Sequence, residues 1–295
     1  MSAQLYLRSR CDVLLGHGDL NLVGSGEYCK DYDFSISKSG QLIKLKLPED
    51  GKTIIAETVI NNINPDIIQI LRASDYDSLN KTEQGKLREI TKPIVDSMRE
   101  LVGLIKQEHT RFDISDSLIG NVRTEWSLGA GKWYSTPYSI TIEGGALPGL
   151  GNMDDKMAQH LQELLSKNEQ PLVAINYLHQ AINSNSTRYQ WIYATISAEL
   201  AIKEILIRIE PKLEVILSTL PSPPLERLYG DVLESLSGVK PQTSDLNRLK
   251  WGAIRRNKLI HSIENEPPSF EEANEYNHFI NDQIKWLLYQ YRHRK

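Results

Sequence analysis

The pattern of apolar and polar positions divides the chain into two halves of different kind. In the first half, glycines separate short segments that alternate or cluster β-forming residues, at 4–15, 33–36, 42–47 and 53–59. From Pro65 to about His109 the apolar positions recur every three or four residues, which predicts helix. A further pair of strands is expected at 122–128 and 138–142. We therefore predict an α+β domain over residues 1–150.

The second half carries only helical patterns. The glycine-rich run from Gly144 to Gly151 precedes it and predicts a domain boundary near residue 150. Helical segments follow at 154–166, 171–183, 188–209, 211–220, 225–237, 244–263 and 270–291. Prolines interrupt or separate several of them, and Ser269 with Glu272 predicts a capping box before the last one. Residues 151–295 are expected to form an all-helical bundle.

Composition and charge exclude several classes of protein. The 295 residues include 34 Lys and Arg and 38 Asp and Glu, so the formal net charge of −4 indicates no particular partner. No stretch approaches the roughly 18 to 20 apolar residues that a membrane-spanning helix needs. The two cysteines, Cys11 and Cys29, are too few for a disulfide scaffold or a zinc site. We expect a cytoplasmic protein without a membrane anchor, a metal or another cofactor.

One charged residue breaks the pattern of the predicted helix 244–263. The core stripe of this helix consists of Leu246, Leu249, Ala253, Ile260 and Ile263. Arg256 falls on the same stripe. A guanidinium is costly to bury unless an anion, a carboxylate or a second subunit receives it. Arg256 therefore marks a candidate site.

Polar residues beside Arg256 extend this site. Asn257 and His261 are four residues apart, so they lie above one another on a neighbouring face of the helix, on the same side as Lys250. The segment from Lys250 to His261 contains four positive charges and no acid; the charges are Lys250, Arg255, Arg256 and Lys258. Such a patch suits a phosphate.

The segment Arg256-Asn257-Lys258-Leu259-Ile260-His261 resembles the R-N-x-x-x-H form of the R-x4-6-H signature of the HEPN superfamily. Members of this superfamily are helical bundles and often RNases in toxin and phage-defence systems. The resemblance covers residues 151–295 and includes a long earlier helix that bears Glu199 and Lys203. It implies metal-independent cleavage of RNA, in which the ribose 2′-hydroxyl attacks the adjacent phosphate. It also implies a homodimer, because two copies of the motif usually meet across a two-fold interface.

The resemblance implies a role for each residue of the motif. His261 would be the general acid or base, because an imidazole holds and releases a proton near neutral pH. Arg256 would bind the phosphate and stabilise its developing charge, and Asn257 would orient His261 or contact the RNA. The residues that would bind the substrate are Lys250, Arg255, Lys258, Glu199 and Lys203.

Two features qualify the biological role that the resemblance implies. In HEPN toxins that a partner nucleotidyltransferase silences, a Tyr stands two residues after the His, but Ile263 occupies that position here. We therefore expect no control through such a Tyr. A free RNase would harm its own cell, so the first domain, an inhibitor or a trigger ligand is expected to restrain it.

A second interpretation keeps the helical bundle but removes the activity. Arg256 would then form a structural ion pair, for instance with Glu199, and the second half would be a dimerisation or nucleic-acid-binding module. The two interpretations predict different geometry. A structural pair places Arg256 against an acid of its own subunit, whereas the nuclease needs Arg256 and His261 open to a shared cleft.

A third interpretation concerns the first half. Gly24-Ser25, followed by Asp31-Tyr32-Asp33, is similar to the G-S…D-x-D motif of nucleotidyltransferases, in which paired aspartates hold Mg²⁺. Glu57 is the nearest candidate for a third acid. Alternatively, Asp31 and Asp33 cap a hairpin.

An aromatic group follows in the same half. Trp126, Trp133, Tyr134 and Tyr138 could stack nucleobases. Packing of a small sheet explains the same residues, and we favour it.

Overall fold

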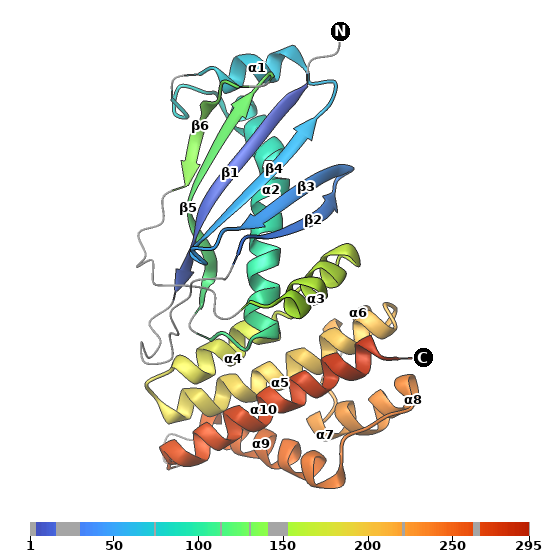
Figure 1. Ribbon diagram of the computed structural model, residues 1–295. Coiled ribbons are helices and arrows are strands. Elements are labelled where there is room, and N and C mark those ends of the chain that lie inside the picture. The colour runs from blue at the N-terminus through green and yellow to red at the C-terminus, as the bar shows by residue number, and fades with distance from the viewer. Residues whose placement is uncertain are drawn as a thin grey trace. The chain divides into compact units, whose positions relative to one another are not determined.

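The computed structural model describes residues 4–15, 30–73, 75–112, 114–129, 131–140, 153–219, 222–261 and 266–294. The chain divides into two compact units, Met1–Pro171 and Leu172–Lys295. The first contains an antiparallel sheet with helices, and the described elements of the second are helices (Figure 1). The predicted α+β class is therefore confirmed. No helix within the described ranges is both long and apolar enough to cross a membrane.

The sheet of the first unit has six antiparallel strands in the order β2-β3-β4-β1-β5-β6. The strands are β1 (Leu5–Leu15), β2 (Tyr32–Lys38), β3 (Gln41–Leu47), β4 (Thr53–Ile60), β5 (Ile114–Ser127) and β6 (Tyr134–Ile140). In β2, apolar residues alternate with more polar ones, so Tyr32, Phe34 and Ile36 share one face and are buried while the residues between them are more exposed. One face of the sheet therefore carries the core.

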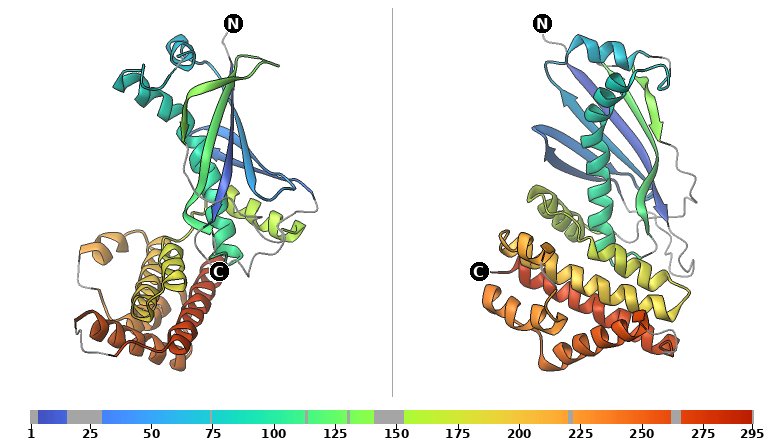
Figure 2. Two further views of the ribbon diagram at one scale, coloured as in Figure 1. Left: turned by 90° about the vertical axis from the view of Figure 1, so that its left-hand side faces the viewer. Right: turned by 180° about the vertical axis from the view of Figure 1, so that it is seen from behind.

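A long helix covers this core face. The helix α2 (Lys81–Glu108) begins at a capping box made by Asn80 and Glu83. Its buried residues recur at helical spacing from Leu87 to Met98, so one side of this part of α2 packs against the sheet, whereas all residues from Glu100 to Gln107 are buried (Figures 1 and 2). The shorter helix α1 (Pro65–Leu71) lies beside α2 and connects it to β4.

The helix α3 (Asp155–Ser166) belongs to the first unit, which extends to Pro171 and not only to residue 150. Its buried leucines, Leu161, Leu164 and Leu165, join the core that the strands form. The side-chain amide of Gln162 also pairs with both backbone groups of Ser35 on edge strand β2, at 2.8 and 3.0 Å. An edge strand exposes unpaired backbone groups, so this contact covers part of the edge. The glycine-rich run 144–151 lies outside the described residues.

The second unit contains α4 (Ala174–Asn183), α5 (Thr187–Ile209), α6 (Leu213–Thr219), α7 (Leu225–Arg227), α8 (Leu233–Ser237), α9 (Thr243–His261) and α10 (Phe270–Arg292). The long helices α5 and α10 lie side by side, with α4 and α9 against α5 (Figure 2). A π-helical turn at Leu228–Val232 joins α7 to α8, within the segment that we predicted as one helix. The predicted capping box of Ser269 and Glu272 begins α10.

Candidate functional site on α5 and α9

The inner face of α9 includes Leu249, Gly252 and Leu259, which are buried. Arg256 lies between Gly252 and Leu259 on the same face, as the sequence pattern predicted. Ile260, which we had assigned to the core stripe, is instead exposed. That assignment was wrong because the helix turns Gly252, and not its more apolar neighbours, towards the interior. Ile263 lies outside the described residues.

Gly252 faces an aromatic stack that fixes α9 on the bundle. The rings of Trp191 on α5 and Tyr276 on α10 stack at 4.0 Å between centroids and 7° between planes. A Cβ atom on Gly252 would lie 2.0 Å from the Tyr276 hydroxyl oxygen. The Trp191 indole also donates to the Gly252 carbonyl at 3.1 Å. The absence of a side chain at residue 252 is therefore required for this packing.

One helical turn further along α9, Arg256 meets an acid of its own chain. Its Nη2 lies 3.2 Å from Glu199 Oε2 on α5, and Glu199 Oε1 receives Lys203 Nζ at 2.7 Å. The side chains of Arg256 and Glu199 are 25% and 23% exposed. Burial raises the pKa of Glu199, but hydrogen bonds from Lys203 and Ser222 and the nearby positive charges outweigh it and lower this pKa. The carboxylate thus stays ionised beside two cations.

The second residue of the motif lies elsewhere on the helix. Five residues separate Arg256 from His261, which corresponds to about 140° around the helix axis and about 7.5 Å along it. His261 and Asn257 are both exposed, and Asn257 lies only about 40° from His261 in angle. The structure therefore brings Arg256, Glu199 and Lys203 together, and it leaves His261 and Asn257 on the solvent side of α9.

The positive charge of α9 is partly neutralised by acids from other helices. Arg255 pairs with Glu272 on α10 at 3.1 Å, and its guanidinium also lies over the rings of Trp191 and Trp251. Arg256 is paired with Glu199. Lys250 is exposed on the outer face of α9. The local field is therefore weaker than the sequence of α9 alone predicts.

The outer face of α9 contains apolar residues that lie outside the predicted core stripe. Trp251 and Ile254 are exposed large side chains, and they line a hollow of about 260 Å³ together with Lys258. The spacing of three and four residues from Trp251 to Ile254 and Lys258 was visible in the sequence. This spacing indicates a second, partly apolar stripe on α9, in addition to the predicted core stripe.

The acids of the nucleotidyltransferase interpretation are exposed: Asp31 directly precedes β2, Asp33 lies on β2 and Glu57 lies on β4. Asp31 Oδ2 lies 2.5 Å from Lys46 Nζ, and Asp31 Oδ1 accepts the backbone N–H of Glu49 at 3.0 Å. The hydrogen bond from Lys46 is the main cause that lowers the pKa of Asp31. The described residues contain no group of three or more His, Cys, Asp or Glu side chains that could hold a metal ion. Gly24-Ser25 lies outside the described residues.

Comparison with models of protein families, with curated proteins and with solved structures finds no match to this chain. The HEPN resemblance therefore stays a prediction that rests on the motif at residues 256–261 and on its helical setting.

Proposed function

We propose that the second unit is a binding module, in which two copies of the chain pair through the outer face of α9 and hold RNA at the paired surface. One observation favours binding over cleavage: Glu199 of the same chain already holds the Arg256 guanidinium, while His261 lies on another face of the helix. A phosphate bound by Arg256 would have to displace a carboxylate that Lys203 also stabilises. The ion pair instead serves to hold α9 on α5.

The composition of the outer face supports self-association. Trp251 and Ile254 are both exposed on α9 and lie only about 60° apart around the helix axis. Large apolar side chains gathered on one solvent-facing helix are typical of a protein interface. In a two-fold dimer the same face is buried on both copies, so each exposed lysine beside it is present twice.

RNA fits the rim of such a dimer. Lys250 and His261 are exposed on the same side of α9 as Ile254, and Lys258 and Arg255 line the hollow together with one acid, Glu266. Lysines on both copies would provide a row of charges for the phosphate backbone, without base specificity. A cytoplasmic location, where RNA is abundant, is part of this proposal.

The substitution Ile254→Asp is expected to weaken the dimer at least about tenfold, because it buries a charge in an apolar contact. Sedimentation velocity of the full chain over a range of concentrations measures this change. Ile216→Asp on α6 is the matched control, since Ile216 is 50% exposed and Ile254 is 46% exposed. A wild-type chain that stays monomeric at about 100 µM, or two variants that sediment alike, would contradict pairing through α9.

A second candidate function is the endoribonuclease that the motif implies. Two observations favour it: His261 and Asn257 stay exposed together, and the buried Nε of Arg256 has no hydrogen-bond acceptor among the described residues. A second copy of α9 would supply the imidazole that one chain does not place beside its own Arg256. A toxin or phage-defence role, with an inhibitor or trigger ligand as restraint, belongs to this candidate alone.

Incubation of wild type, His261→Ala and Arg256→Ala with labelled RNA in EDTA separates the two candidates. We expect a gel shift without cleavage, and we expect His261→Ala to change RNA affinity by no more than about threefold. His278→Ala on α10 is the matched control because this histidine is also exposed in the second unit. Cleavage by wild type and by His278→Ala, but not by His261→Ala, would establish the nuclease and overturn the binding-only proposal.

A further inference from the structure

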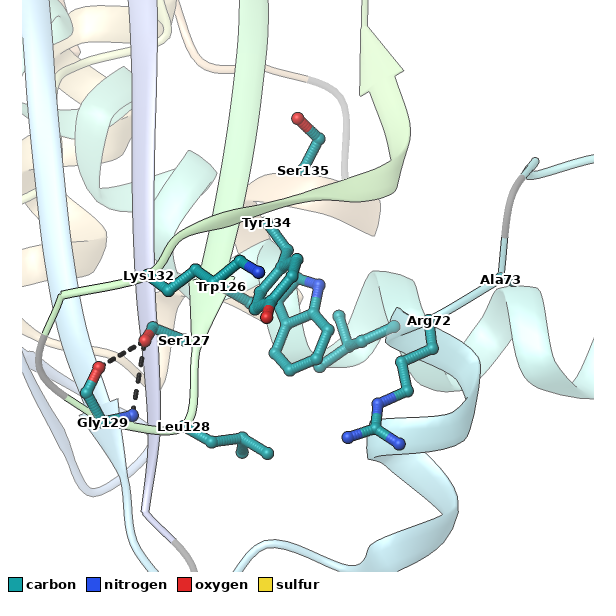
Figure 3. Close-up of a pocket in the computed structure, with 10 residues that line it drawn as sticks. Arg72, Ala73, Trp126, Ser127, Leu128, Gly129, Lys132, Tyr134 and Ser135 are labelled. Carbon is teal, nitrogen blue, oxygen red and sulfur yellow. Dashed lines mark hydrogen bonds between the residues drawn. The ribbon is translucent and has the colours of Figure 1, made fainter.

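A pocket of about 650 Å³ in the first unit lies between the end of α1 and the hairpin of β5 and β6 (Figure 3). Leu71 and Arg72 line it from α1, while Trp126, Leu128 and Tyr134 line it from the hairpin. The volume is in the range of pockets that hold small organic ligands. All of these residues belong to the first unit, so the pocket is independent of the proposal for α9.

The pocket has a positive lining without an acid. Arg72 and Lys132 both line it, and no Asp or Glu is among the described residues that line it. Neither cation forms an ion pair with a carboxylate that the structure describes, and both are exposed. In Figure 3 the Arg72 guanidinium and the Lys132 ammonium lie on opposite sides of the Trp126 and Tyr134 rings. Two unpaired cations around an apolar floor favour an anionic ligand.

The aromatic floor has an unused donor. Trp126 and Tyr134 stack at 5.1 Å between ring centroids, and the ammonium of Lys132 lies 5.1 Å from the Tyr134 centroid. Trp126 is buried, and its Nε1 has no hydrogen-bond acceptor among the described residues. Tyr134 is 44% exposed, so it is the part of the stack that a ligand can move. A buried N–H without a partner favours a ligand that brings an acceptor.

We propose that this pocket binds a nucleoside monophosphate. A phosphate monoester carries roughly −1.5 to −2 charges at pH 7, which suits two cations with no competing acid, whereas a carboxylate carries only one charge. The base packs against Tyr134 and Leu128, because flat aromatic rings stack on exposed aromatic side chains. When Tyr134 turns aside, a ring nitrogen or carbonyl of the base accepts from Trp126 Nε1.

Isothermal titration of the full chain with AMP, GMP, CMP and UMP tests this proposal. At least one nucleotide is expected to bind below about 1 mM, and more weakly as salt rises from about 50 to 200 mM. Adenosine lacks the phosphate and ribose 5-phosphate lacks the base, so each is expected to bind at least about tenfold more weakly than the best nucleotide. Inorganic phosphate is a third control and is expected to bind as weakly as adenosine and ribose 5-phosphate.

The double variant Arg72→Gln/Lys132→Gln is expected to weaken the best nucleotide at least about tenfold. Lys44→Gln/Lys52→Gln removes the same charge from exposed positions outside the pocket and is expected to change affinity less than about twofold. All four side chains are exposed, and thermal unfolding checks that both variants fold. The proposal is overturned if no nucleotide binds below about 1 mM, if adenosine, ribose 5-phosphate or inorganic phosphate binds as tightly as the best nucleotide, or if the two double variants behave alike.

Discussion

Gly252→Ala is expected to destabilise the second unit by about 3 kcal/mol, although alanine is the better helix former. The new Cβ atom would lie 2.0 Å from Tyr276 Oη and 2.5 Å from Cζ. The Tyr276 ring cannot retreat easily, because it is buried and stacks on Trp191 at 4.0 Å. Either α9 moves away from α5 and α10 or the aromatic stack separates, and both changes lose buried contacts. Urea unfolding followed by tryptophan fluorescence measures the loss.

Gly85→Ala on α2 is the control for this substitution. A Cβ atom at Gly85 would meet nothing within 4 Å, so only the helix preference changes. We expect Gly85→Ala to stabilise the first unit by about 0.5 to 1 kcal/mol. If both alanine variants change stability in the same direction, the close approach of Tyr276 to α9 is wrong.

The face of α9 shows what sequence periodicity can and cannot predict. The spacing of apolar positions predicts that Arg256 lies on the inner face of α9, and in the structure Arg256 lies there, beside Glu199. The same counting placed Ile260 inside, and Ile260 is exposed. Periodicity treats glycine as neutral, so it could not show that the ring of Tyr276, about 24 residues away in sequence, takes the place of a side chain at Gly252. Only the packing between α9 and α10 decides how the helix is turned.

The sequence predicts β1 to β4 nearly to their ends, β5 only over its second half and β6 only at its end, and it does not predict the order of the strands in the sheet. The hairpin from β2 to β3 joins neighbours in sequence, and Ser39 and Gly40 make its turn with positive φ angles. The strand β1 instead lies between β4 and β5, which begin about 40 and about 100 residues after it ends. Such long-range pairing depends on which faces must be covered by α2, and local residue preferences do not record it.

The membership of α3 could not be predicted for a related reason. The pattern of an amphipathic helix predicts that one face is apolar, but it does not predict which sheet or helix packs against that face. The leucines of α3 pack with the strands, and Gln162 pairs with Ser35. The prolines and glycines around α3 mark loops, and a loop can precede a helix of either unit. The sequence likewise shows that Trp126 and Tyr134 are close together in the chain. It does not show that Arg72 approaches them, because that contact depends on the tertiary fold.

Lys38→Met is expected to destabilise the first unit by about 3 kcal/mol, because it leaves a buried carboxylate without its cation. The side chain of Glu100 on α2 is only 1% exposed, and Lys38 Nζ at the end of β2 forms an ion pair with its Oε2. Neither carboxylate oxygen has a well-formed hydrogen bond among the described residues. Lys38 is thus the cation that compensates the buried charge of Glu100. Its removal is expected to lower the free energy of unfolding by more than the loss of an exposed ion pair would.

Two further variants separate this pair from a general effect of charge. Lys44→Met removes an exposed lysine of the same sheet and is expected to change the free energy of unfolding by less than about 0.5 kcal/mol. Lys38→Met/Glu100→Leu removes both charges and is expected to unfold within about 1 kcal/mol of wild type, because an apolar pair of similar volume can replace a buried ion pair. Adding Glu100→Leu completes a double-mutant cycle with wild type, Lys38→Met and the double variant, and urea unfolding measures all of these proteins. If Lys38→Met costs no more than Lys44→Met, Glu100 is reached by water, and the contact between β2 and α2 does not depend on the ion pair.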